Sequence, residues 1–332
     1  MELNVKTIHY EAELITETGA RIELAPAQIS LSWEENVNEL AARANLKLQQ
    51  KTLEGGWLSG IAKLNCIIRI FSSWNGGARQ LMYEGTIWDW HYTSATQKIL
   101  RVTAYDGLIR LSRSREFYHY QPGMSTQALV SDIFGQWGIP LTYEWRSITH
   151  AQKSFRGRKS VADMAISLLE EVRDKTGEDY VILFSAGRVV IRGYGANSLV
   201  FELDRNATVS TSNRRTLNNL VTKVKVYGKE DSGGRRQVEG VVEGDTRFGV
   251  LQDIVLRDSN TSLAEAMSEA NTLIANRGIP EPTIEWEGPD VPFLRKGDYV
   301  RLRAGDLIGL FAVEGVIHRA DARSMSLTLS RR

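Results

Sequence analysis

The chain has 332 residues, of which 42% are hydrophobic and 24% are charged, and its 41 basic and 40 acidic residues leave a net charge of +1. This composition is typical of a folded globular protein and excludes a disordered chain, and the length predicts two or three domains of roughly 100–200 residues each. The near-neutral charge argues against sequence-specific nucleic-acid binding, because neutralising phosphates requires a basic surplus.

Residues 1–117 predict an N-terminal β-barrel-like domain, because short alternating segments are separated by glycine turns such as Asn75-Gly76-Gly77. The segment 34–49 is ambiguous, since its Glu, Ala and Leu content favours a helix. Its second half nevertheless alternates small or apolar residues with polar ones, which is the period of a strand. We therefore predict a strand over residues 40–49.

Residues 118–204 predict a small α/β domain made of two related helix–strand units. Ser125 is placed to cap a first helix that carries Leu129 and Ile133, and a strand follows at 141–145. About 35 residues later, Ser160 and Asp163 have the spacing of a capping box. Gly177 ends this second helix, and a hairpin is expected over 180–191.

Residues 205–332 predict a C-terminal β-barrel-like domain with one helix at about 262–276. Ser262 and Glu265 form a second capping-box pattern, and Gly278 ends the helix. A polar, glycine-rich loop is expected over 228–240. The fold class that follows is mainly β with α+β character: two β-barrel-like (tube) domains flank the small α/β domain.

No catalytic, cofactor-binding or metal site is predicted. The histidines lie too far apart in the sequence for typical zinc spacing, and Gly193-Tyr194-Gly195 is not followed by a helix, as a dinucleotide site would require. Carboxylate pairs occur at 34–35, 170–171 and 178–179, and a solvated surface explains them better than acid–base chemistry. We therefore expect no enzyme activity.

A lone cysteine and the N-terminal residues bear on where the chain is made. Cys66 lies among apolar residues, so we expect a small buried side chain and folding in a reducing cytosol. The first residues lack the pattern of a secretion signal, and no stretch approaches the roughly 18 apolar residues of a membrane span.

Two surfaces are candidates for contacts with partners. Trp88 and Trp90 alternate on one predicted strand, which places both indoles on one face, either as a carbohydrate platform or as an anchor for a core or subunit contact; the anchor is favoured. The segment 146–159 is basic and has no acidic residue, and it includes Arg156, Arg158 and Lys159. It is either a solvated loop or a docking site for an acidic neighbour.

Several segments, taken in order, carry a family resemblance: Tyr83–Trp88, Leu100–Asp106, Leu129–Pro140, Gly297–Leu302, Gly315–His318 and Met325–Leu329. Through these segments the chain resembles the XkdQ-like proteins of PBSX-type defective prophages, which are related to phage late-control protein D and the hubs of contractile tails. The helix from Ser262 also lies where the C-terminal helix of that family is expected.

This resemblance implies a structural baseplate hub of a contractile phage tail or phage-tail-like bacteriocin, made in the bacterial cytoplasm. Such hubs are homotrimers with two tube domains per subunit, and the resulting ring joins the hexameric tail tube to the central spike. The implied partners are further copies of the chain, a tail-tube or tube-initiator protein, the spike and other baseplate proteins, with the tape-measure protein left open. A cell-wall-binding module and a wall hydrolase are the alternatives.

Overall fold

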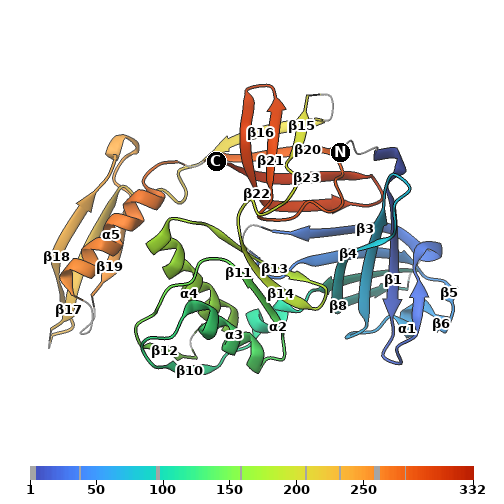
Figure 1. Cartoon of the computed structure of the whole chain (residues 1–332), viewed down its shortest axis with the longest axis horizontal. Coiled ribbons are helices and arrows are strands. Elements are labelled where there is room, and N and C mark those ends of the chain that lie inside the picture. Colours follow the sequence, from blue (N-terminus) through green and yellow to red (C-terminus); the bar gives the residue numbers. More distant parts are fainter. Residues whose placement is uncertain are drawn as a thin grey trace. The chain divides into compact units, whose positions relative to one another are not determined.

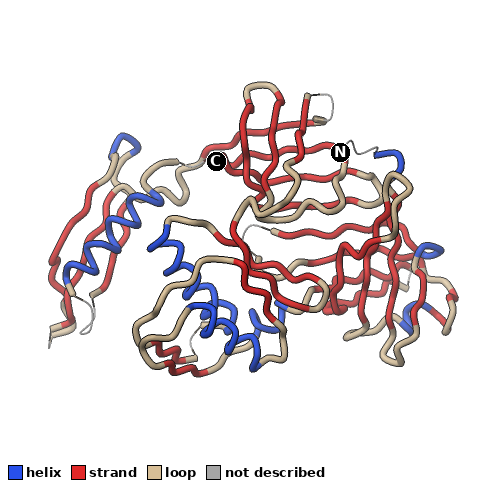
Figure 2. The backbone as a smooth tube through the Cα atoms, viewed as in Figure 1, coloured by secondary structure: helices blue, strands red, loops and turns tan. Residues whose placement is uncertain are grey.

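The computed structural model describes residues 5–36, 39–94, 98–157, 159–205, 208–231, 233–257, 262–280 and 282–332. It divides the chain into two compact units (Figure 1). Unit 1 combines Met1–Thr211 with Glu285–Arg332, and unit 2 is Ser212–Ile284. Strands outnumber helices throughout (Figure 2), which confirms the predicted mainly β fold class.

Unit 1 is built on a 13-stranded sheet whose order is β16-β20-β23-β22-β3-β4-β9-β8-β7-β1-β2, with β21 beside β22 and β15 beside β21. The strands β16 and β20 also carry the chain out of this unit and back. The strands are β1 (His9–Ile15), β2 (Arg21–Glu23), β3 (Gln28–Glu35), β4 (Arg43–Gln49), β7 (Ile67–Ser73), β8 (Gln80–Thr93), β9 (Ile99–Tyr105), β15 (Phe201–Asp204), β16 (Ser210–Arg215), β20 (Pro282–Pro289), β21 (Tyr299–Ala304), β22 (Leu307–Arg319) and β23 (Ser324–Arg331).

The two ends of the chain meet in this sheet through the long strand β22. Its first half pairs with β21, and its second half pairs with β3, where His318 lies opposite Trp33 and Val316 opposite Glu35. The two predicted β domains therefore share one continuous sheet.

The strand predicted over residues 40–49 is present as β4, which begins only at Arg43 and ends at Gln49. Ala44, Leu46 and Leu48 of β4 are buried on one face, and burial of this alternating set outweighs the helix propensity of its residues. Cys66 is buried, as expected. Short elements complete the region: η1 (Val5–Thr7), η2 (Ala25–Ala27), β5 (Thr52–Leu53), β6 (Gly56–Trp57), α1 (Leu58–Ile61) and α2 (Leu108–Arg113). The first strand, β1, begins at His9, after η1.

The helix–strand region folds as its capping signals predict. The Ser125 hydroxyl accepts a hydrogen bond from the amide of Ala128 at the start of α3, Ser160 and Asp163 form the capping box of α4, and Gly177 ends α4 with a φ of 72°. A three-stranded sheet of order β11-β14-β13 and a two-stranded ribbon of β10 and β12 accompany the helices. The bounds are β10 (Phe117–Tyr120), α3 (Thr126–Gln136), β11 (Leu141–Glu144), β12 (Lys153–Arg156), α4 (Val161–Thr176), β13 (Tyr180–Ser185) and β14 (Arg188–Gly193).

Unit 2 is a three-stranded sheet of order β18-β17-β19 with one helix, α5. Ala266 and Ala270 of α5 pack on Val224, Val226 and Val255 of the sheet. Ser262 and Glu265 form the predicted capping box. The bounds are β17 (Lys223–Glu230), β18 (Arg236–Glu243), η3 (Thr246–Phe248), β19 (Gln252–Leu256) and α5 (Leu263–Arg277).

The predicted C-terminal domain, 205–332, is divided in the structure. Residues 212–284 form unit 2 with its own core, whereas 285–332 belong to unit 1. The predicted domain is divided because Met325, Leu327 and Leu329 of β23 are buried in unit 1 and do not belong to the core around α5 in unit 2. Most of the predicted loop 228–240 belongs to the strands β17 and β18.

Candidate functional site

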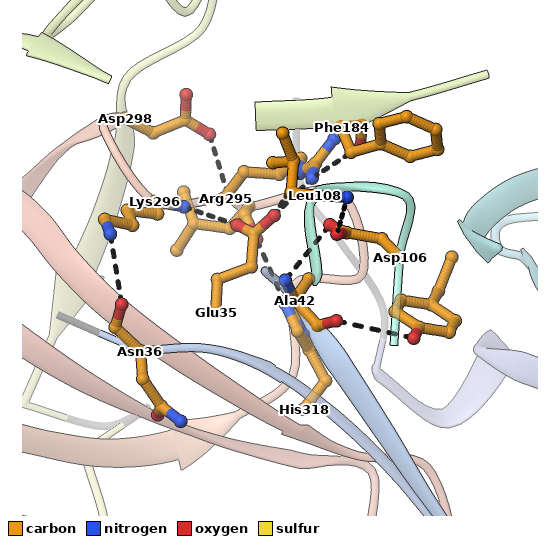
Figure 3. A network of polar contacts seen from close by, with 12 residues as sticks. Glu35, Asn36, Ala42, Asp106, Leu108, Phe184, Arg295, Lys296, Asp298 and His318 are labelled. Atoms are coloured by element: carbon orange, nitrogen blue, oxygen red, sulfur yellow. Dashed lines mark hydrogen bonds and ion pairs between the residues drawn. The ribbon is translucent and has the colours of Figure 1, made fainter. Parts of the chain in front are cut away.

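A buried ionic network links segments of unit 1 that are far apart in the sequence (Figure 3). Glu35 ends β3, and its carboxylate accepts hydrogen bonds from Nε of Arg295 at 2.9 Å and from the amide of Lys296 at 2.9 Å. Nη2 of Arg295 also donates to Glu35 and, at 3.1 Å, to the carbonyl oxygen of Phe184 in β13. Glu35 and Arg295 therefore hold β3, β13 and the segment before β21 together.

The charges of this network determine its protonation. Burial opposes ionisation of Glu35, but Arg295 and the amide of Lys296 outweigh it and hold the Glu35 pKa below its usual value. Burial raises the pKa of Asp298, which accepts hydrogen bonds from the Arg295 amide and, at 2.5 Å, from Nη2 of Arg192. Burial lowers the pKa of Lys296, whose ammonium donates to the carbonyl oxygen of Asn36 at 3.0 Å.

Asp106 belongs to the same region and fixes the end of β9. Its two carboxylate oxygens accept hydrogen bonds from the amides of Ala42 and Leu108, each at 3.0 Å. Burial nevertheless raises the pKa of Asp106 to about 7. The side chain thus caps the start of α2 and ties it to the segment before β4.

His318 of β22 is held at both ring nitrogens. Nε2 lies 3.0 Å from the carbonyl oxygen of Leu294, which only accepts, so this nitrogen carries a proton. Nδ1 lies 2.7 Å from the Asp290 carboxylate. Trp33 stacks on the imidazole ring with centroids 4.5 Å apart. Tyr10 donates a further hydrogen bond to Asp290.

A pocket of about 280 Å³ opens beside this network. Trp33, Phe184 and Phe293 contribute rings to its wall, and Asp106 and Arg295 contribute charges that bind other groups of the chain. Within the described ranges, no three His, Cys, Asp or Glu side chains gather in a way that could hold a metal ion. The network therefore positions segments rather than presenting free reactive groups.

The two tryptophans do not share a face in the way that strict alternation predicts. The pairing of β8 with β9 shifts register between Ile87 and Asp89, and Trp88 is the extra residue of this bulge. Trp90 faces Val102 and packs against the core, whereas Trp88 is 43% exposed. The bulge leaves Trp88 as an isolated exposed ring.

The basic segment 146–159 is partly a strand, and part of its charge is neutralised inside unit 1. Arg146 pairs with Glu178 at 2.9 Å, and Lys153 of β12 pairs with Glu171 at 2.5 Å. Glu178 is exposed, as expected for a solvated carboxylate, whereas Glu171 is only partly exposed. Arg156 and Lys159 are exposed, and Arg158 lies outside the described residues.

The network itself gave little signal in the sequence. Glu34 and Glu35 were expected to be solvated, yet Glu34 pairs with Arg43 and Glu35 with Arg295. The first pair joins adjacent strands, but the second joins residues 260 positions apart, which no local pattern predicts. Among the described residues, no helix combines the length and apolar character needed to cross a membrane.

The family model for YqbQ-like proteins matches residues 31–330, so the chain belongs to the YqbQ-like family. The chain is 22% identical over 203 residues to the uncharacterized protein YqbQ of Bacillus subtilis strain 168, a match that covers 59% of this chain and 60% of that protein. This relative is thus matched over less than two thirds of its length.

Solved structures of tail proteins have a similar fold. The tail protein of Neisseria meningitidis MC58 superposes with a TM-score of 0.68 at 12% identity and 97% coverage of both chains. The 43 kDa tail protein of prophage MuSo2 from Shewanella oneidensis gives 0.69 at 12% identity, covering 97% of this chain and 98% of that one. An Escherichia coli type VI secretion component, described as similar to T4 tail proteins gp27 and gp5, gives 0.56 at 12% identity and covers 96% and 76%.

Proposed function

We propose that the chain is a structural, non-enzymatic hub of a contractile phage tail or phage-tail-like particle, of the XkdQ and late-control protein D type. The observation that carries the proposal is the similarity in fold of nearly the whole chain to the tail protein of Neisseria meningitidis and to the tail protein of prophage MuSo2. The organisation of unit 1 suits a structural role, because the buried pair Glu35–Arg295 fixes the large sheet against the α/β region.

As a hub, the chain forms a homotrimer that joins the hexameric tail tube to the central spike, within the baseplate of the particle. The family resemblance implies two tube domains per subunit, so a trimeric ring has six similar elements, and such a ring is closed by heterologous contacts. Both ends of the chain contribute strands to the large sheet, with β22 as the element they share.

Two measurements test this proposal. Mass photometry of the purified chain should give a species with three times the 37.3 kDa mass of one subunit. Cryo-electron microscopy of particles from a producing strain should place the chain at the junction of tube and spike. Particles that lack the chain at this junction would contradict the proposal.

The cell-wall-binding alternative receives no specific support. A carbohydrate platform on β8 requires two exposed rings side by side, and the bulge at Trp88 turns Trp90 against the core. The wall-hydrolase alternative also lacks specific support. The charged side chains of the buried network bind other groups of the chain and do not form an acid–base pair that faces a substrate.

A further inference from the structure

The outer face of the ribbon β10–β12 carries an exposed phenylalanine whose ring lies against a glycine. Phe117 is 73% exposed, although a large apolar ring is normally buried. Its neighbours on β10 alternate, so Tyr118 and Tyr120 face the core and Phe117 faces outward. The ring lies over Gly157, where an added Cβ would come within 3.1 Å of its atoms and where φ is +66°. A glycine at this position therefore lets the ring lie flat on the backbone.

Exposed cations occur across the ribbon from this ring and in the chain segments near it. Arg156 is the cross-strand neighbour of Phe117. The amide of Val161 donates to the carbonyl oxygen of Ser114 at 2.9 Å, which brings the segment around Lys159 beside that around Arg115. All of the cations in this group are exposed, and within the described part of the chain none of them has an ion-pair partner; they are Arg113, Arg115, Arg156 and Lys159.

Two acidic side chains in the same region accept hydrogen bonds from nearby backbone amides. The carboxylate of Glu116 accepts a hydrogen bond from the amide of Phe117 at 2.7 Å, and that of Asp163 accepts one from the amide of Ser160 at 3.1 Å. Both carboxylates keep their negative charge, but the cations outnumber them, so the region keeps a net positive charge. This contrasts with Arg146 and Lys153 of the same basic segment, which are neutralised by Glu178 and Glu171.

We infer that this surface, which we call the Phe117 patch, docks an acidic protein segment of a neighbouring tail component. Aromatic rings and arginines are the residues most enriched in the centres of protein interfaces, where a ring supplies apolar area and the cations select charge. A single ring offers no row of stacking platforms for nucleic-acid bases. Figure 1 shows β10 and β12 at the margin of the α/β region, on the side away from the large sheet. The inference rests on the proposed place of the chain in a tail particle.

Photo-crosslinking in assembled particles tests this inference. Phe117 is replaced by p-benzoylphenylalanine, and the same residue is placed at the exposed Ile308 as a control for incorporation. Irradiation should link position 117 to an acidic stretch of a different tail protein, which mass spectrometry of the crosslinked peptide identifies. Crosslinks to nucleic acid, to wall glycan or to a second copy of this chain overturn the inference, and so does the absence of any crosslink at 117.

Charge reversal provides an independent measurement on the identified partner. The double variant Arg156→Glu/Lys159→Glu should bind that partner at least tenfold more weakly, because two rim charges become repulsive. The matched control Arg21→Glu/Lys63→Glu makes the same charge change at exposed sites elsewhere and should bind as the wild type does. Equal affinities of the two double variants overturn the inference. Particles that lack the chain altogether contradict the proposed function instead, and the inference falls with it.

Discussion

Glu35 and Arg295 lie 260 positions apart in the sequence and form an ion pair that is largely withdrawn from solvent. Glu35 ends β3, and Arg295 precedes β21 and also reaches the carbonyl oxygen of Phe184. One guanidinium therefore bridges the N-terminal strands, the α/β region and the C-terminal strands of unit 1.

Removing the carboxylate should destabilise unit 1 strongly. Glu35→Ala leaves the Arg295 charge buried without its partner, and breaking a buried ion pair in this way costs about 3–5 kcal/mol. Urea denaturation followed by tryptophan fluorescence measures the loss. The control is Glu202→Ala, which removes an exposed pair with Arg303 and should cost about 1 kcal/mol or less. Equal losses for the two variants would mean that Glu35–Arg295 is not a structural joint.

Asp106 should make the stability of the protein fall as the pH rises from about 4 to 7. Its pKa is about 7 in the folded chain because of burial, against an ordinary value of 3.8. In this window the folded chain holds a proton that the unfolded chain has released, so the free energy of unfolding decreases with pH by up to about 1.4 kcal/mol per unit.

The variant Asp106→Asn should remove this contribution, because an amide does not titrate. The measurement is the free energy of unfolding in urea at several pH values across the window, for the wild type and the variant. Glu35 affects the stability in a lower pH range. Its pKa is held below the usual value, so the stability that it contributes is lost only as the pH falls through that low range. A wild-type slope that survives in the variant would refute the assignment to Asp106.

Local signals predicted the longer helices α3, α4 and α5, whereas the short helices α1 and α2 were not predicted. Ser160 with Asp163 and Ser262 with Glu265 begin α4 and α5, because a capping box satisfies amides within one turn and depends on no distant residue. The strand β4 was also predicted, because the alternation of apolar and polar side chains can be recognised from neighbouring residues alone.

The long-range features could not be read in the same way. The pairing of β22 with β3 decides which residues share the large sheet, and it joins segments almost 300 positions apart. The bulge at Trp88 also lacks a local signal, because it inserts one residue into an otherwise regular alternation and changes the face of Trp90. The sequence analysis did not single out Phe117 as a surface residue. The alternation along β10 nevertheless places its ring on the face away from Tyr118 and Tyr120.

The two tryptophans of β8 should differ in their contribution to stability. Trp90→Ala removes a ring that packs against the core and should cost about 2–3 kcal/mol, somewhat less than a fully buried ring. Trp88→Ala removes an exposed ring and should cost about 0.5 kcal/mol. Thermal unfolding of both variants measures the difference. A larger loss for Trp88→Ala would show that its ring, not that of Trp90, supports the core.

Gly297 should tolerate no side chain, because the backbone and a neighbour both exclude one. Its φ is +86°, and an added Cβ would lie 2.5 Å from Cγ1 of Val181 in β13. Gly297→Ala should therefore cost about 3 kcal/mol, from backbone strain and overpacking together. Gly19→Ala is the control for strain alone, since Gly19 has a φ of +82° and open space around it, and it should cost about 1 kcal/mol. An alanine at position 181 would keep its own Cβ 2.8 Å from the added one, so Val181→Gly is the partner variant, and Gly297→Ala should cost less in that background than in the wild type. If the two costs are equal, the close approach of β13 to Gly297 is not the cause of the loss.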